Sequence, residues 1–406
     1  MSMASPTADA NRASSPTRRA RLIARLFDRA VPELQAGRLQ LVLPNGAVIA
    51  HRGAEPGPDA TLTMHRWRAL QRLLLDGDHG FAEGYLDGDW STPDLCELLS
   101  LCMHNEAALT RPAEGRWVSR AVHRLAHRWR ANSRRGSRRN IAAHYDLGND
   151  FFLPWLDRGM NYSSALYADG DSLETAQERK LDCAAELLDL KGGERVLEIG
   201  CGWGALAERL IRRGASVCGI TLSTEQLAYA RARLAGAIKR GRADVRLLDY
   251  RDVTDTYDRI ASIEMIEAVG ERYWPTYFTK LRDALRDGGV AVVQAITIDE
   301  RRFAEYRKRP DFIQRYIFPG GLLPTAPIIE REAASAGLQL VHRQSFGDSY
   351  AKTLREWRDR FQQAWLGIEK LGFDERFRRM WDYYLAYCEV GFRTGALDVS
   401  FFKLAG

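Results

Sequence analysis

The first hundred residues alternate apolar and polar positions in a way that predicts a small α+β domain. Residues 38–50, RLQLVLPNGAVIA, contain two alternating runs on either side of a Pro-Asn-Gly turn, a combination typical of a β-hairpin. The stretch 64–77 has helical periodicity and closes on a glycine, and a second helix is expected over 93–104. Between these two helices, the glycine- and aspartate-rich stretch 77–90 is expected to form a loop.

From residue 172 onward, short apolar runs alternate with amphipathic stretches. This order is typical of an α/β fold, Rossmann-like and doubly wound, in which helices cover both faces of a mostly parallel sheet. One helix is expected to begin at Ser223 or Thr224, because either side chain can act as an N-cap. The strands are expected at 195–200, 215–221, 243–249, 258–265, 288–298, 338–346 and 398–405.

The composition is that of an ordinary globular protein, with 406 residues, 45% of them hydrophobic and 28% charged. No apolar run reaches the roughly 18 residues of a membrane span. None of the six cysteines forms a C-x-x-C pair, which favours a reducing cytoplasm over a disulfide framework or a metal site. We expect a disordered tail without a secretory signal at 1–20, an α+β domain at 21–110, a basic segment at 111–139 and the α/β domain at 140–406.

Residues Arg116–Arg139, the basic segment, carry nine arginines and no acid. In its first half an arginine and an apolar residue each recur every fourth position, which predicts a basic amphipathic helix. A plain solvated face and docking on an anionic membrane are two interpretations of equal weight. Nucleic acid is a weaker third, because nothing else resembles a base-reading module. We therefore predict no nucleic-acid partner and a peripheral position on the inner face of the membrane.

A glycine-rich turn follows the first strand of the α/β domain, in VLEIGCGWGALA (Val196–Ala207). Gly200, Gly202 and Gly204 remove side chains where the backbone reverses and a ligand can approach it. Dinucleotide enzymes use a similar loop, so the motif alone is weak. Glu198 precedes the first glycine, where it can meet a cationic amino-acid tail better than a pyrophosphate, which favours a methyl donor as the cofactor.

The chain resembles the cyclopropane-fatty-acyl-phospholipid synthase family, which includes the mycolic acid cyclopropane synthases. The resemblance runs from about Asn140 to the C-terminus and rests on segments such as IAAHYDLGNDFF, MNYSSALY, LEIGCGWGALA, DRIASIEMIEAVG, YIFPGGLLP and FGDSYAKTL. It implies a class I methyltransferase domain that binds S-adenosylmethionine and needs no metal. The contacts that it implies are Tyr162, Ser163, Val196, Leu197, Glu198, Ile199, Gly200, Cys201, Gly202, Trp203, Gly204, Thr221, Leu222, Ser223, Gln226, Asp249 and Tyr250. Among them, the residues from Thr221 to Gln226 would reach the ribose, and Asp249 and Tyr250 match the adenine pocket.

The resemblance also implies a reaction without a protein nucleophile. An alkene in an unsaturated phospholipid acyl chain attacks the sulfonium methyl, a carbocation forms, and a bound bicarbonate removes a proton so that a cyclopropane ring closes. Aromatic faces can stabilise such a cation, and Tyr316, Phe318 and Tyr350 are candidates. Glu267, Tyr350 and Ile296 match the family residues that hold the bicarbonate.

Three positions in and beside this inferred site depart from the family pattern. Gln294 stands in place of a His and Ser164 in place of a Cys, and Ala268 replaces the His that usually follows the Glu. Gln can donate a hydrogen bond but cannot carry a proton, whereas the Cys acts through its backbone, which Ser164 keeps. Cys388 matches a Cys once assigned an active role, and a buried structural thiol is the favoured interpretation.

Three functions follow from these residues. The first is a cyclopropane synthase. The second keeps the methyl transfer but ends in a mid-chain methyl or methylene branch, an outcome that the Gln294 departure favours. The third is a lipid-binding protein without catalysis, against which the intact glycine loop and Glu267 argue. A homodimer is compatible with all three.

Overall fold

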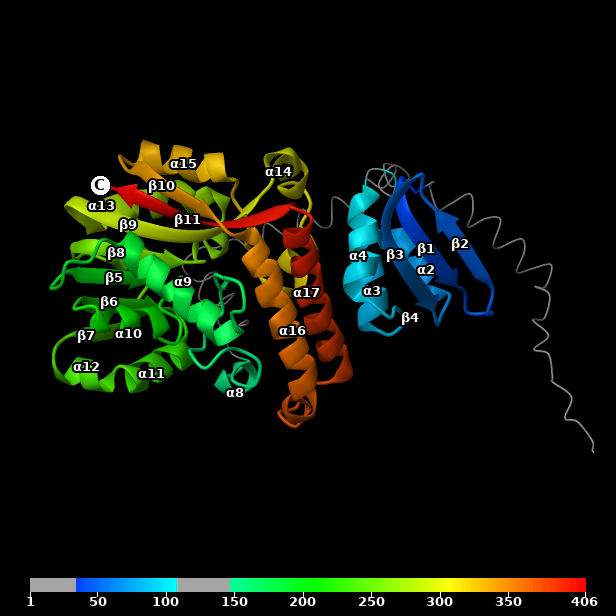
Figure 1. Ribbon diagram of the computed structural model, residues 1–406, viewed down its shortest axis with the longest axis horizontal. Helices are drawn as coiled ribbons and strands as arrows, with labels where there is room; N and C mark the ends of the chain where they lie inside the picture. The colour runs from blue at the N-terminus through cyan, green and yellow to red at the C-terminus, as the bar shows by residue number, and fades with distance from the viewer. Residues whose placement is uncertain (1–33, 107, 109–146) are drawn as a thin grey trace, which may run out of the picture. The chain divides into compact units, whose positions relative to one another are not determined.

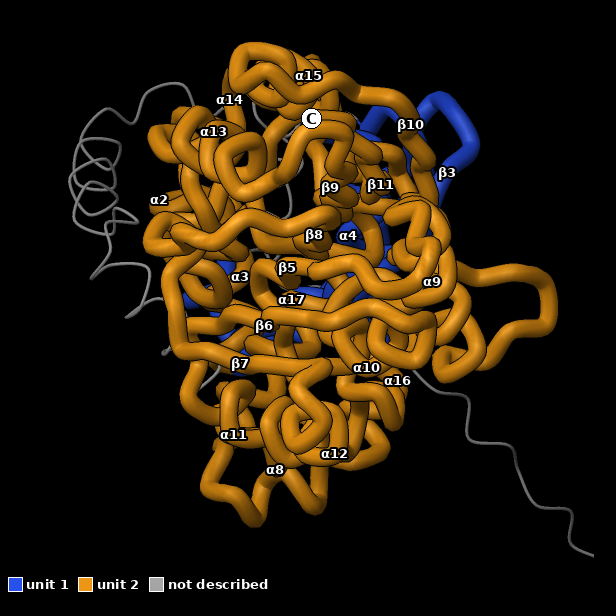
Figure 2. The backbone as a smooth tube through the Cα atoms, turned by 90° about the vertical axis from the view of Figure 1, so that its left-hand side faces the viewer, with its two compact units in different colours: residues 1–71, 88–114 blue, residues 72–87, 115–406 orange. Residues whose placement is uncertain are grey.

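The computed structural model describes residues 34–106, 108 and 147–406. The predicted tail at 1–20 and the basic segment lie outside these residues. The chain divides into two compact units, the first drawn from 1–71 and 88–114 and the second from 72–87 and 115–406 (Figure 2).

The first unit contains a four-stranded sheet in the order β2-β1-β3-β4. The predicted hairpin is confirmed, because β1 and β2 pair antiparallel, and β3 adds to β1 in parallel. The buried Asn105 side chain ties the end of α4 to the sheet by donating to Ala36 O and Leu101 O. The elements are β1 Ala36–Val42, β2 Val48–Arg52, β3 Glu55–Met64, β4 Trp90–Ser91, α2 Arg68–Asp76, which crosses into the second unit, and α4 Leu95–His104.

The loop expected at 77–90 is instead largely helical, as α3, Asp78–Leu86. Its glycines suggested a turn, but they serve close packing: a Cβ on Gly80 would come within 2.0 Å of Arg72 O on α2. α3 belongs to the second unit, where Tyr85 Oη donates to Asp382 Oδ2 on α17 at 2.6 Å.

The second unit contains a seven-stranded sheet in the order β10-β11-β9-β8-β5-β6-β7. β5, β6, β7, β8 and β9 pair in parallel, and only β11 runs against its neighbours. All seven predicted strands and the mostly parallel sheet are therefore confirmed. The strands are β5 Arg195–Ile199, β6 Ser216–Thr221, β7 Ala243–Leu247, β8 Tyr257–Ile263, β9 Leu285–Ile298, β10 Gln339–Ser345 and β11 Leu397–Ala405.

Helices cover both faces of this sheet (Figure 1). α11 begins after Ser223, whose side chain accepts from Gln226 N, so Ser223 is the N-cap. The helices are α8 Asn149–Phe152, α9 Leu173–Leu187, α10 Ala205–Arg212, α11 Thr224–Arg233, α12 Ala235–Lys239, α13 Trp274–Ala284, α14 Glu300–Tyr306, α15 Ala326–Ser335, α16 Gly347–Glu369 and α17 Glu375–Arg393, with short helical turns η2 Tyr250–Asp252, η3 Ile266–Ala268, η4 Glu271–Tyr273 and η5 Ile313–Ile317.

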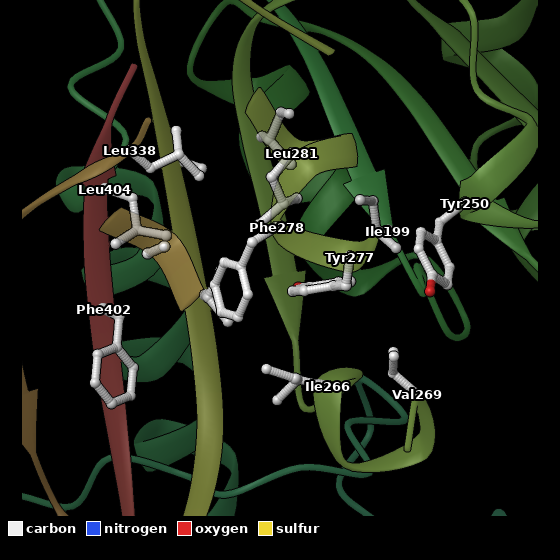
Figure 3. Packing of buried hydrophobic residues seen from close by; sticks show 14 of the residues in the cluster. Ile199, Tyr250, Ile266, Val269, Tyr277, Phe278, Leu281, Leu338, Phe402 and Leu404 are labelled. Atoms are coloured by element: carbon white, nitrogen blue, oxygen red, sulfur yellow. The ribbon is translucent and has the colours of Figure 1, made fainter. Parts of the chain in front are cut away.

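The main core lies between the sheet and the helices α13 and α15 (Figure 3). Leu197 and Ile199 of β5 point into this core, where Phe278 of α13 is fully buried. Since successive side chains of a strand face opposite sides, Glu198 projects to the other face, toward α9 and α10. On that face it accepts a hydrogen bond from the Ala207 backbone.

The parallel strands end at one edge of the sheet, which the antiparallel helices α16 and α17 cover (Figure 1). Ligands of open α/β sheets bind at the carboxyl ends of the strands. The glycine loop after β5, the turn after β8 and the start of α16 meet at this edge, so the candidate site is built there. No helix of the described ranges is long and apolar enough to cross a membrane.

Candidate active site

The glycine loop leaves one open face of backbone. Gly200, Gly202 and Gly204 all have positive φ, at 77°, 50° and 86°. A Cβ on Gly200 would come within 2.6 Å of Met265 Cγ, so this glycine is required for packing. A Cβ on Gly202 would meet no atom within 4 Å, so the space above it is available to a ligand.

Glu198 is the buried acid of the loop, with 3% of its surface exposed. Burial raises the pKa of its carboxyl to about 8. Oε2 is shielded from solvent and has no hydrogen-bond partner within the described residues. An unpartnered buried carboxylate oxygen is costly unless a ligand satisfies it. The α-ammonium group of S-adenosylmethionine has the charge and the donors that fit the Glu198 carboxylate. The neighbours of Glu198 on β5, Val196, Leu197 and Ile199, are buried and hold the strand in the core.

The residues after β6 form a small hydroxyl and amide cluster, as the sequence suggested for a ribose site. Thr221 Oγ1 donates to Gln226 Oε1 at 2.9 Å and accepts from Ser223 N at 3.1 Å. All three residues are buried. The cluster is therefore already ordered by its own hydrogen bonds, and Leu222 between them lines the adjoining pocket.

A pocket lies beside this cluster and contains Asp249 and Tyr250, the residues that the resemblance assigns to adenine. Asp249 lies in it, but its carboxylate is held by Arg251 at 2.6 Å. Tyr250 contributes a ring whose hydroxyl has no partner within the described residues. Arg251 and Met265 were not predicted from the sequence. The lining residues are Leu222, Asp249, Tyr250, Arg251, Met265, Ala268 and Val269.

The segment before α9 brings Tyr162 and Ser163 to the same edge. Tyr162 Oη and Tyr384 Oη are 2.9 Å apart, within hydrogen-bond distance. Ser163 Oγ accepts from Lys180 Nζ at 2.7 Å. Lys180 is almost fully buried, and burial lowers the pKa of its ammonium to about 8.

Two loop residues have structural surroundings. Trp203 is buried, and its Nε1 donates to Asn149 Oδ1 at 2.7 Å, which fixes α8 against the loop. Burial raises the pKa of the Cys201 thiol well above its ordinary value. Their side chains therefore shape the loop, and the thiol stays neutral.

The centre of the site is an acid, Glu264, that was not predicted from the sequence. Glu264 follows β8 and accepts three hydrogen bonds: Oε1 from Ser164 N at 2.8 Å and from Gln294 Nε2 at 2.7 Å, and Oε2 from Tyr350 Oη at 2.7 Å. The Ser164 backbone N–H, which the resemblance assigns to bicarbonate, thus donates to Glu264. The three predicted residues converge, but on Glu264.

Glu267 lies beside this acid, on η3. Its Oε1 accepts from Ile296 N at 2.6 Å. Its Oε2 is buried without a partner among the described residues. Burial, and then the charge of Glu264, raise the pKa of Glu267 to about 8. Glu264 accepts from three donors and lies beside Glu267, an arrangement that favours a shared proton on Glu267 over Glu264.

Other predicted residues do not join the acid pair. Burial, and then Asp311, raise the pKa of the Cys388 thiol. A neutral thiol of this kind has no acid–base role at pH 7, in line with the structural interpretation. Tyr316 donates to Glu83 on α3, and Phe318 packs with its ring centroid 6.2 Å from that of Tyr384.

The sequence offered signals for the residues that were missed. Glu264 is an acid directly after an apolar strand, the position at which parallel sheets present ligands. Lys180 is a charged residue on the apolar face of a helix, which implies a buried partner. Within the described ranges, no cluster of three His, Cys, Asp or Glu side chains could hold a metal ion.

Comparison with known proteins agrees with this geometry. Residues 132–402 match the family model of mycolic acid cyclopropane synthetase. The chain is 43% identical over 373 residues to tuberculostearic acid methyltransferase from Mycobacterium tuberculosis, covering 89% of this chain and 86% of that protein. It is 35% identical to cyclopropane-fatty-acyl-phospholipid synthase from Escherichia coli, covering 90% and 92%.

Solved structures give the same result. The structure of mycolic acid cyclopropane synthase in complex with SAH and CTAB aligns with a TM-score of 0.62 and 32% identity, covering 66% of this chain and 98% of that one. The cyclopropane synthase MmaA2 from Mycobacterium tuberculosis aligns with the same values. The predicted fold class and the predicted enzyme class, an S-adenosylmethionine-dependent methyltransferase, are confirmed.

Proposed function

This chain belongs to the mycolic acid cyclopropane synthetase family, and we propose that it transfers a methyl group from S-adenosylmethionine to the cis double bond of an unsaturated acyl chain in a phospholipid. The observation that carries the proposal is that the pocket at Asp249 directly adjoins the acid Glu264. Met265 lines the pocket together with Leu222 and Asp249. Its neighbour in sequence, Glu264, belongs to the acid pair and accepts from Tyr350 Oη. A methyl donor bound in this pocket would therefore lie at the same edge of the sheet as a group that can accept a proton.

The residues of the site divide the work. Glu198, the Gly202 backbone and the pocket at Asp249 would hold S-adenosylmethionine, which supplies an electrophilic methyl group when bound. Methyl transfer to one alkene carbon leaves a cation on its neighbour. Three aromatic rings lie near the acid pair, those of Tyr162, Tyr350 and Trp357. The centroids of the Tyr162 and Trp357 rings are 5.2 Å apart. These rings can stabilise the cation and exclude water.

Two observations support a lipid held in a membrane. The Escherichia coli relative is named for a fatty-acyl phospholipid and covers 90% of this chain. The basic segment has the charge that an anionic bilayer surface attracts. We therefore place the enzyme in the cytoplasm, bound peripherally to the inner face of the membrane.

Two products can follow from the same cation. Loss of a proton from the new methyl group closes a cyclopropane ring, the product that the family description supports. A hydride shift before that loss gives a tertiary cation and then a methylene branch. Gln294 favours this second product, as does 43% identity to a relative named a methyltransferase. A saturated methyl branch would additionally need a hydride donor from another protein.

The test is the lipid itself. Cells that express the chain should gain one CH2 per modified acyl chain in their phospholipids, measured by mass spectrometry. NMR of the methyl esters then separates the products, because ring methylene protons appear well upfield of chain protons and an exocyclic methylene gives alkene signals. We expect Gln294→His to change the ratio of branched product to ring. Lipids without any gain of CH2 would contradict the proposed function.

A further inference from the structure

Glu264 accepts hydrogen bonds from donors that could otherwise hold a bound anion. Its carboxylate collects the Ser164 N–H, the Gln294 amide and the Tyr350 hydroxyl, with all three distances between 2.7 and 2.8 Å. Two of these groups, Gln294 and Tyr350, together with the Ser164 backbone, are those that the family resemblance assigns to bicarbonate. A further assigned donor, Ile296 N, is taken by Glu267.

The backbone shows that this placement is maintained at a cost. Glu264 has φ 48°, and only Met160 and Asp189 share a positive φ among the described non-glycine residues. Such strain costs on the order of 1–3 kcal/mol and persists where the surroundings enforce it, often at functional sites. Two hydrogen bonds with Gln294 fix this backbone conformation. Glu264 N donates to Gln294 O at 2.8 Å, and Gln294 Nε2 donates to the Glu264 carboxylate.

Bicarbonate does not fit a site arranged in this way. Its donors are already used, and a second anion would lie against the carboxylate of Glu264. Crowded like charges oppose ionisation, and the charge of Glu264 already adds to burial in raising the pKa of Glu267. The predicted bicarbonate cofactor is therefore not supported by these residues.

We propose that the carboxylate of Glu264 is itself the general base of the reaction, in place of bicarbonate. This inference rests on the proposed methyl transfer to an alkene. An ionised carboxylate offers about four acceptor positions, and three are used, so one remains for a proton. Burial raises the pKa of Glu264, which makes it a better base than an exposed glutamate.

The step balances without an oxidant or a reductant. The alkene π pair forms the new C–C bond while the methyl–sulfur bond breaks, and its electrons stay on the sulfur. A C–H bond of the cation then breaks, its proton forms an O–H bond with Glu264, and its electron pair closes the ring or forms the methylene double bond. Glu264 releases the proton to water after the product leaves.

The experiment compares two glutamates and two buffers. Glu264→Gln keeps the size but removes the base, and product formation should fall about a hundredfold or more. Glu267→Gln imitates the protonated acid, so it should cost less than about tenfold. S-adenosylmethionine affinity, measured by calorimetry, should stay within about threefold in both variants. The wild type should keep its rate in CO2-free buffer.

A third variant turns the site into one that needs an added anion. Glu264→Gly is compatible with the positive φ and leaves the three donors without an acceptor. Added bicarbonate or formate should therefore raise the rate of this variant at least tenfold over its rate without the anion. Asp189→Gly, at the other edge of the sheet with φ 52°, is the matched control and should keep full activity.

The outcomes separate the two proposals. Full activity of Glu264→Gln overturns the assignment of the base, and so does a wild type whose rate falls tenfold without CO2 and returns with bicarbonate. A larger loss in Glu267→Gln than in Glu264→Gln also overturns it. A wild type that adds no CH2 to any lipid overturns the proposed function, and the base assignment with it.

Discussion

The buried carboxyl of Glu198 should lower the stability of the folded protein at neutral pH, and the same carboxyl is needed to bind the cofactor. A carboxyl whose pKa rises from 4.5 to about 8 on folding binds more protons in the folded state than in the unfolded state between these pH values. Its contribution to stability is therefore full below pH 4.5 and is lost as the pH rises toward 8. At about 1.4 kcal/mol per pKa unit, the loss at pH 7 is about 3 kcal/mol.

Glu198→Gln removes this penalty, because the amide has nearly the same shape and no charge. We expect the free energy of unfolding at pH 7, from denaturant titration, to increase by up to about 3 kcal/mol. The gain should disappear near pH 5. Glu267 adds a similar slope to both proteins, so the difference between the proteins reports Glu198 together with its charge contact to Lys180. The exposed Glu178 of α9 supplies the control variant, Glu178→Gln.

The same substitution should abolish cofactor binding, since the ammonium group loses its counter-charge. In the wild type, calorimetry should show a proton released when S-adenosylmethionine binds at pH 7, seen as a dependence of the binding enthalpy on the buffer. Affinity should rise with pH up to about 8. A Glu198→Gln variant that binds as tightly as the wild type, or that keeps the full slope of stability against pH, would refute the reasoning.

The remaining predictions concern the loop and the basic segment. Gly202→Val should abolish cofactor binding in calorimetry while circular dichroism shows an intact fold, whereas Gly241→Val, at another open position with φ 67°, should carry the same backbone strain and bind normally. Removing three charges should weaken binding to anionic vesicles by about a hundredfold at low salt, at about 1 kcal/mol each, and equal binding to neutral vesicles would contradict this. The three substitutions are Arg120→Gln, Arg124→Gln and Arg128→Gln.

Local patterns predicted much of the fold. The seven strands could be identified because their apolar runs are short and bounded by turns, and the glycine loop because its geometry depends on a few adjacent residues. The stretch 77–90 was predicted wrongly, because Gly80 is a helical glycine that lets another backbone approach it. That requirement comes from α2, a contact that no local pattern contains.

The site was predicted in its outline and missed at its centre. Resemblance supplied Tyr350, Gln294 and Ser164, and the structure brings all three together. It did not supply Glu264, because the group that these donors bind comes from a position that the family pattern leaves unassigned. Only the three-dimensional arrangement shows that donors from a loop, a strand and a helix meet on one carboxylate.

The departure at Gln294 acquires a physical reason once Glu264 is the acceptor. A histidine at this position would lie beside the carboxylate that Gln294 Nε2 contacts at 2.7 Å, and it would take up a proton, because an adjacent negative charge favours imidazolium. The resulting ion pair would lower the pKa of Glu264 and weaken it as a base. A glutamine donates the same hydrogen bond without a charge. Gln294 and Glu264 should therefore behave as one unit, whose separate substitutions do not add. Histidine would suit the site best in a chain that has first lost the Glu264 side chain.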